Sequence, residues 1–185
     1  MLHEGVSSYD ALREKVDAFA HAVSARREDV VCRAGCSGCC HAKLSLCDVE
    51  ADALADAVRA LPAEARRALT AQLERPDDDR CALLDDDGRC AAYAGRPLVC
   101  RTQGLPLRYP AGTVPVDAVR ASAGGDVTWC PLNFEDTPPE AHDVLDAERV
   151  DLMLALINRD HSATPTRRTS IATIVRRALA GEHRD

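Results

Sequence analysis

The residues best suited to chemistry are cysteines, and a first group of four falls within one short segment: Cys32, Cys36, Cys39 and Cys40. The step from Cys36 to Cys39 is a Cys-x2-Cys turn, in which both sulfurs can face one ion, as in zinc and iron–sulfur sites. Gly35 and Gly38 relieve steric limits in this turn and let backbone N–H groups point toward the sulfurs. The spacing therefore predicts a metal site.

Cys39 and Cys40 are adjacent, so they need not bind the same ion, because neighbouring side chains of an extended segment point in opposite directions. One of them could face a second metal, bridge two ions or be buried as a small apolar side chain. A disulfide between them would be strained. The next residue, His41, could be a ligand, although a lone histidine in a loop more often is not.

A second group of cysteines is spread over a longer segment: Cys81, Cys90, Cys100 and Cys130. Between Cys81 and Cys90, an Asp-Gly turn at 85–88 lies between short apolar runs and predicts a β-hairpin that brings the two thiols together. This group could complete sites begun by the first group, either zinc sites of four cysteines or a 4Fe-4S cluster. Arg96 and Arg101 are candidate cofactor-binding residues, since they could balance the negative thiolates; a purely surface role is equally open.

Cys47 lies apart from both groups, among apolar residues at the entry to a predicted helix. We expect it to be a buried structural cysteine. Eight of the nine cysteines then remain as candidate metal ligands, enough for two four-cysteine sites or for one four-iron cluster with further thiols. Zinc and iron use the same ligands, so the spacing leaves the metal open.

Composition narrows the class of protein. The chain has 185 residues, which fits one domain over 1–185, and only 3% of them are aromatic, which limits the core. A net charge of -7 argues against a nucleic-acid binder. The sequence contains neither an apolar run of about 18 residues, which a membrane helix needs, nor an apolar signal segment. We therefore expect a cytoplasmic protein, in whose reducing surroundings clustered cysteines bind metal rather than form disulfides.

Apolar residues at helical spacing predict five helices, at about 8–29, 48–61, 62–74, 140–160 and 169–181. Ser7 or Ser8 is expected to cap the first helix, and the second and third are expected to form an antiparallel hairpin. The apolar stripe of the last helix is expected in the core, with docking onto a protein partner as the alternative.

The middle of the chain has a different composition. From Arg75 to about Pro139, prolines, glycines and aspartates are frequent and no long helix fits, while a second short hairpin is predicted near Leu105–Val116. The predicted fold class is therefore mainly α. Terminal helices at 8–29 and 140–181 and a helical hairpin surround an irregular, cysteine-rich region at 32–134 that contains short β-hairpins.

Two segments resemble the CxxCxxCC or YkgJ-like cysteine-cluster family: CRAGCSGCC at 32–40 and CALLDDDGRCAAYAGRPLVCR at 81–101. Five residues of the second segment fall on the family's pattern: Tyr93, Arg96, Pro97, Cys100 and Arg101. GLPLRYP at 104–110 and WCPLNF at 129–134 look like one branch of that family. The first gap here has three residues where the family's name implies two, so Cys32 departs most from the pattern.

The resemblance implies a domain that chelates zinc or iron, without a defined reaction. A longer relative, flagellin lysine N-methylase, joins such a region to protein methylation. The glycine-rich loop after a strand that would suit a methyl donor is missing here, so the resemblance does not carry that activity to this chain. We expect a metal-binding protein, with a cluster-dependent enzyme and a thiol-based redox or metal sensor as alternatives.

Overall fold

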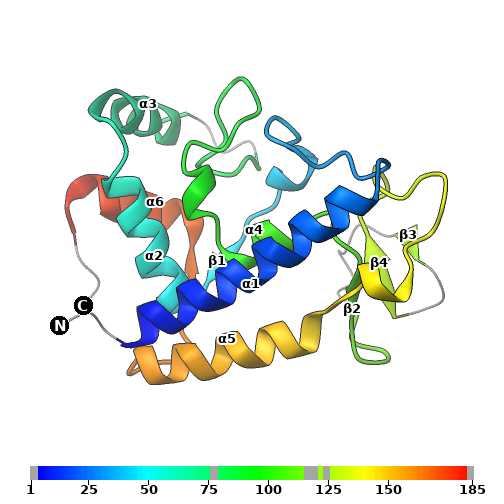
Figure 1. Cartoon of the computed structure of the whole chain (residues 1–185). Coiled ribbons are helices and arrows are strands. Elements are labelled where there is room, and N and C mark those ends of the chain that lie inside the picture. The colour runs from blue at the N-terminus through cyan, green and yellow to red at the C-terminus, as the bar shows by residue number, and fades with distance from the viewer. Residues whose placement is uncertain (1–3, 76–78, 115–120, 123–125, 183–185) are drawn as a thin grey trace. The chain divides into compact units, whose positions relative to one another are not determined.

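The computed structural model describes residues 4–75, 79–114, 121–122 and 126–182, and the fold is mainly α, as predicted (Figure 1). Within these residues no helix is both long and apolar enough to cross a membrane. The α-helices are α1 (Glu4–Arg26), α2 (Asp48–Arg59), α3 (Ala63–Leu73), α4 (Leu98–Thr102), α5 (Ala147–His161) and α6 (Ile171–Ala180).

Short strands and 3-10 turns connect these helices. The 3-10 turns are η1 (Gly38–Cys40), η2 (Tyr93–Gly95) and η3 (Ala141–Asp143). The strands are β1 (Ser45–Leu46), β2 (Leu107–Arg108), β3 (Ala121–Ser122), β4 (Val127–Trp129), β5 (Leu145–Asp146) and β6 (Thr169–Ser170). One sheet contains β1 and β6, and the other has the strand order β3-β4-β2-β5.

Residue contacts divide the chain into two compact units, which we describe separately. The first unit comprises Met1–Tyr9, Arg33–Pro97 and Ile157–Asp185, and the second comprises Asp10–Cys32 and Leu98–Leu156. Each unit therefore combines segments that are far apart in the sequence. That residues 1–185 act as one functional domain remains a prediction.

In the first unit, α2 packs against α6, and α3 also contacts α6 (Figure 1). The side chain of Ser170 caps α6 by accepting a hydrogen bond of 3.2 Å from the Thr173 backbone N–H, and Gly181 ends the helix with a φ of 76°. The apolar face of α6 is buried, as predicted: Ile171, Ile174, Val175 and Ala178.

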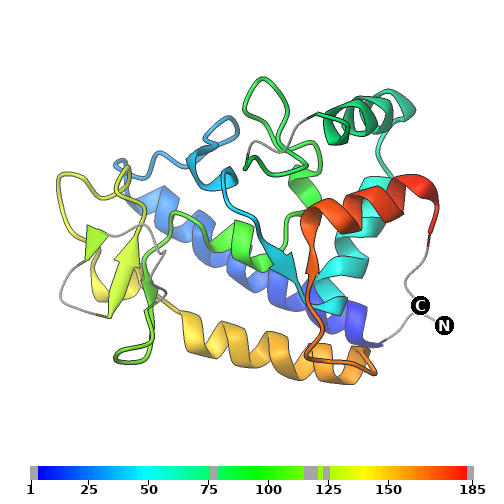
Figure 2. The same ribbon diagram turned by 180° about the vertical axis from the view of Figure 1, so that it is seen from behind.

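The start of α2 is fastened to the segment that precedes β6. β1 pairs antiparallel with β6 (Figure 2). In this pairing Ser45 lies opposite Ser170. Asp48, at the first position of α2, has a fully buried side chain that accepts hydrogen bonds from Arg167 and from the Ser162 hydroxyl. A buried carboxylate requires such partners, and these fix the direction in which α2 leaves the sheet.

In the second unit, β2 is a central strand that pairs antiparallel with β4 and parallel with β5. The rings of Trp129 and Phe134 pack edge to face, with centroids 6.4 Å apart. Both side chains are buried, and two large rings bury much apolar area in one place. The buried cluster consists of Val23, Leu105, Trp129 and Phe134.

Three predicted helix boundaries are wrong. The first helix begins at Glu4, so neither Ser7 nor Ser8 caps it, and it ends at Arg26. The helix predicted from 140 begins only at Ala147, because η3 and β5 precede it. The Leu145 N–H donates to the Pro106 carbonyl at 2.8 Å, so strand pairing replaces the first turns of the predicted helix.

Of the two predicted hairpins, the first forms a turn as expected and the second does not form among the residues that the structure describes. Around 85–88 the chain turns as predicted, although Leu84 and Cys90 form only an isolated antiparallel bridge. The second hairpin is wrong within the described residues, because β2 pairs with β4 and β5 rather than with its sequence neighbours; residues 115–120 lie outside the description. The helices α2 and α3 form as predicted, but each has its main contacts with α6 rather than with the other.

Candidate metal centre

Four of the candidate ligands lie near one another in the first unit: Cys39, Cys40, Cys81 and Cys90. The backbone N–H of Cys81 donates to the carbonyl of Cys40 at 2.8 Å, which joins the loop of the first cysteine group to the hairpin of the second. The turn of the same hairpin also touches this loop, because a Cβ added to Gly88 would lie 3.3 Å from Ser37 Oγ. The loop of the first cysteine group and the hairpin of the second are thus held together by a backbone hydrogen bond and by the close approach of the turn.

The acidic turn shapes the hairpin that carries Cys81 and Cys90. Asp85 Oδ1 accepts hydrogen bonds from the backbone N–H groups of Asp87 and Arg89, at 3.0 and 2.7 Å, which closes the turn. Arg80 donates to the carbonyl of Asp85 at 2.8 Å. The side chain of Asp85, in the predicted turn, therefore stabilises that turn.

Burial is the main influence on the thiols of the hairpin. It raises the pKa of Cys81 and of Cys90, while the backbone N–H groups of Leu83 and Ala92 oppose this by donating to the respective sulfurs. In both cases the donor lies two residues after the cysteine. N–H groups aimed at sulfur stabilise a thiolate, which is the form that binds metal.

The thiols also influence one another. The hydrogen bond between the thiols of Cys39 and Cys40, followed by burial, raises the pKa of Cys39 far above its ordinary value. Cys39 acts electrostatically on Cys81, and Cys81 acts on Cys90. The four thiols therefore form one series of mutually interacting neighbours, which we call the thiol cluster.

Arg96 supplies positive charge to this cluster. Its guanidinium lies 3.7 Å from the centroid of the Tyr93 ring, and its charge lowers the pKa of Cys39 and Cys90, against the larger effects of hydrogen bonding and burial. The preceding turn, η2, packs closely on α2, because a Cβ on Gly95 would lie 2.3 Å from Ala57 Cβ. Glycine at this position thus allows the close approach that places Arg96.

Three candidate ligands belong to the second unit: Cys32, Cys100 and Cys130. Cys32 accepts a hydrogen bond from Asn133 Nδ2 at 3.2 Å, and a Cβ on Gly104 would lie 2.3 Å from its sulfur. The backbone N–H of Asn133 donates to the Cys130 carbonyl at 2.9 Å. Cys32 and Cys130 are therefore both linked to Asn133, while Cys100 lies in α4.

Asn133 is a buried polar side chain whose role the sequence analysis missed. It is 1% exposed, and its amide bonds the Val31 N–H, the Gly104 carbonyl and the Cys32 sulfur. It occurs in the WCPLNF segment, so its position next to a cysteine-proline step was the available signal. A buried asparagine with three partners holds the surrounding backbone in place.

The remaining predicted residues have distinct surroundings. Arg101 forms an ion pair with the Asp17 carboxylate, and its side chain is only 6% exposed. Cys36 is half-buried, and His41 is exposed. Cys47 is buried, as predicted, and its Sγ lies 3.5 Å from Glu50 Oε2; burial, followed by the charge of Glu50, raises its pKa to about 12.

The chemistry of these donors fits zinc or iron, whereas their present arrangement is not a finished ligand shell. All nine cysteines are described, and none is joined in a disulfide. Among the described residues, no three or more His, Cys, Asp or Glu side chains are placed so that they could hold an ion. Binding through the thiol cluster would therefore require its side chains to turn toward a common point.

Comparison with known proteins agrees with this choice of metal. Residues 31–113 match the family model described as "CxxCxxCC: Putative zinc- or iron-chelating domain". The matched segment is therefore similar to this domain, and it contains every candidate ligand except Cys130. No curated protein and no solved structure matches the chain.

Proposed function

We propose that the chain binds zinc or iron through the thiolates of Cys39, Cys40, Cys81 and Cys90. The observation that carries this proposal is the hydrogen bond from the Cys81 N–H to the Cys40 carbonyl, because it joins the last cysteine of the first group to the first cysteine of the second. The N–H groups directed at Cys81 and Cys90 support it further. Four thiolates match the ligand number of a structural zinc site and of an iron–sulfur cluster.

The other predicted ligands extend the proposal. Cys36 belongs to the first unit and could replace a member of the thiol cluster. In the second unit we propose Cys32, Cys100 and Cys130 as further ligands, with Arg101 balancing their charge. The alternatives of a zinc ion and a 4Fe-4S cluster, and a cytoplasmic location, remain part of the proposal.

A bound ion would crosslink the cysteine-rich loops. Four thiolates around a divalent ion leave a net charge of about minus two, which Arg96 would partly balance. Because the ion would bind only the folded arrangement of the thiols, its binding free energy would add to the free energy of folding. The role of this chain's own residues is then to gather four sulfurs and keep positive charge beside them.

The proposal is tested by substituting one ligand and one matched buried cysteine. We expect Cys81→Ser to lose bound metal and to melt at a lower temperature, because one sulfur ligand is removed. Cys47→Ala serves as the control, and it should keep the metal of the unsubstituted protein. Metal content is measured by mass spectrometry after anaerobic purification, and equal content in Cys81→Ser and wild type would refute the assignment.

A redox or metal sensor is a second candidate function. The observation that favours it is the direct hydrogen bond between the thiols of Cys39 and Cys40, one of which is exposed. Two cluster thiols could reduce one peroxide to two waters and form one disulfide, releasing the metal. Thiol counts and released metal before and after mild peroxide test this function, which an unchanged thiol count would exclude.

A further inference from the structure

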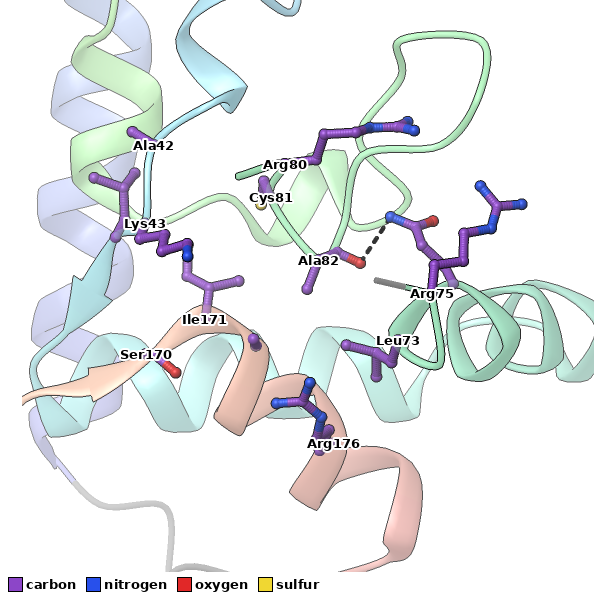
Figure 3. Close-up of a pocket in the computed structure, with 13 residues that line it drawn as sticks. Ala42, Lys43, Leu73, Arg75, Arg80, Cys81, Ala82, Ser170, Ile171 and Arg176 are labelled. Carbon is purple, nitrogen blue, oxygen red and sulfur yellow. Dashed lines mark hydrogen bonds between the residues drawn. The ribbon is translucent and has the colours of Figure 1, made fainter. Parts of the chain in front are cut away.

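A second feature of the first unit is a pocket of about 310 Å³ beside the thiol cluster (Figure 3). Its wall is formed by residues 42–44, by the end of α3, by residues 80–82 and by the start of α6. Its volume is at the lower end of the range of small-molecule sites, about 300–1,000 Å³. It is therefore large enough for a small ligand.

The charged side chains that line this pocket are all cationic: Lys43, Arg75, Arg80 and Arg176 (Figure 3). Two described carboxylates pair with these groups from outside the lining. Asp79 lies 3.1 Å from Lys43, and Asp86 lies 2.7 Å from Arg75 and 3.4 Å from Arg80. The two carboxylates are 77% and 67% exposed, so solvent weakens these ion pairs, and four cations against two carboxylates leave an excess of positive charge among the described residues around the pocket.

The pocket also contains a thiol of the cluster. Cys81 lines it together with Arg80, while the Ala82 carbonyl is already bonded to Gln72 Nε2 at 3.2 Å (Figure 3). A ligand in the pocket would therefore lie next to Cys81. Several cations around one cavity favour a ligand with more than one negative group, because each cation can make a charge-assisted hydrogen bond.

We infer that this pocket binds a small organic or inorganic polyanion, one that bears two or more carboxylate or phosphate groups, beside the Cys81 thiol. This inference goes beyond metal binding, because the positive lining attracts anions whether or not the thiols hold an ion. A bound polyanion covers Cys81 and so controls access to the thiol cluster. The cluster and the pocket share Cys81. The cations that line the pocket are not among the proposed metal ligands.

The test uses calorimetric titration of the full chain with citrate and with pyrophosphate, and acetate as the single-charge comparison. The variant Lys43→Gln/Arg176→Gln removes two lining charges and spares Arg80, which supports the hairpin turn. We expect its affinity to fall by about tenfold or more, since each lost charged partner weakens binding. The control Arg67→Gln/Arg177→Gln makes the same charge change on α3 and α6 outside the pocket and should bind as wild type does.

The possible outcomes distinguish anion binding in the pocket from metal binding by the thiol cluster. Preference for citrate or for pyrophosphate identifies the carboxylate or the phosphate class, and weak binding of acetate supports a polyanion site. Bound ligand should slow alkylation of Cys81 but not of Cys130, as mapped by mass spectrometry. Binding that persists in a metal-free Cys39→Ser protein shows that the pocket acts alone. Failure of both polyanions to bind at millimolar concentration, or an equal loss in the control variant, would overturn the inference.

Discussion

The chemical character of each cysteine is set by its neighbours rather than by its residue type. Cys47 is buried against the Glu50 carboxylate, where a thiolate would be both desolvated and repelled. Cys81 is also partly buried, and a backbone N–H points at its sulfur as one does at that of Cys47, but its electrostatic neighbour is the Cys39 thiol rather than a carboxylate. The first environment suits a neutral thiol that packs, and the second suits a sulfur that can bind metal.

This difference predicts how stability depends on pH. Folding raises the pKa of Cys47 from 9.0 to about 12, so the folded state holds this proton more tightly than the unfolded state. The stability gained below the ordinary pKa should therefore be lost as the pH rises from about 9 toward about 12. Urea unfolding of the metal-free protein should show a steeper loss above about pH 9 for wild type than for Cys47→Ala. Equal slopes in the two proteins would contradict this reading.

At the scale of the elements, a buried carboxylate fixes the start of α2. The Asp48 side chain is fully buried and bonded to Arg167 and Ser162, whereas Asp56, on the same helix, is 76% exposed and pairs with Arg59. Both are aspartates of one helix, so they allow a matched comparison of a buried and an exposed carboxylate.

Asp48→Ala should lower the free energy of unfolding by about 2–3 kcal/mol, because it leaves the Arg167 charge without its buried partner, although that arginine is partly exposed. Asp56→Ala should change it by about 1 kcal/mol or less, as is usual for an exposed pair. Urea unfolding measures both values. An equal decrease in the free energy of unfolding for the two variants would show that the buried ion pair stabilises the fold no more than the exposed one.

The helices were predictable where local signals are strong. The Ser170 cap, the apolar stripe of α6 and Gly181 are all close in sequence, and the helix predicted at about 169–181 agrees with α6. The start of α5 was missed because β5 pairs with β2, a partner almost forty residues away. The spacing of apolar residues within one segment does not predict pairing with a strand so far away in the sequence. The same limit applies to α2 and α3, whose common partner, α6, lies far along the chain.

At the scale of the whole molecule, the division into two units also divides the candidate ligands. The three-residue gap after Cys32 marks this cysteine as the departure from the family's spacing, and Cys32 belongs to the second unit while Cys36 belongs to the first. The spacing of the cysteines therefore predicts candidate metal ligands, but it does not predict which of them belong to the same unit. The cationic pocket was also missed, since its four charges come from four separate segments.

The central claim, that this chain is a metal-binding protein, is tested most directly by one analysis. Protein purified without oxygen is measured for zinc, iron and acid-labile sulfide per chain. We predict stoichiometric zinc without sulfide, or iron with sulfide and broad visible absorption, and loss of the metal in Cys39→Ser/Cys81→Ser. A stably folded wild-type protein that contains neither metal would contradict the claim.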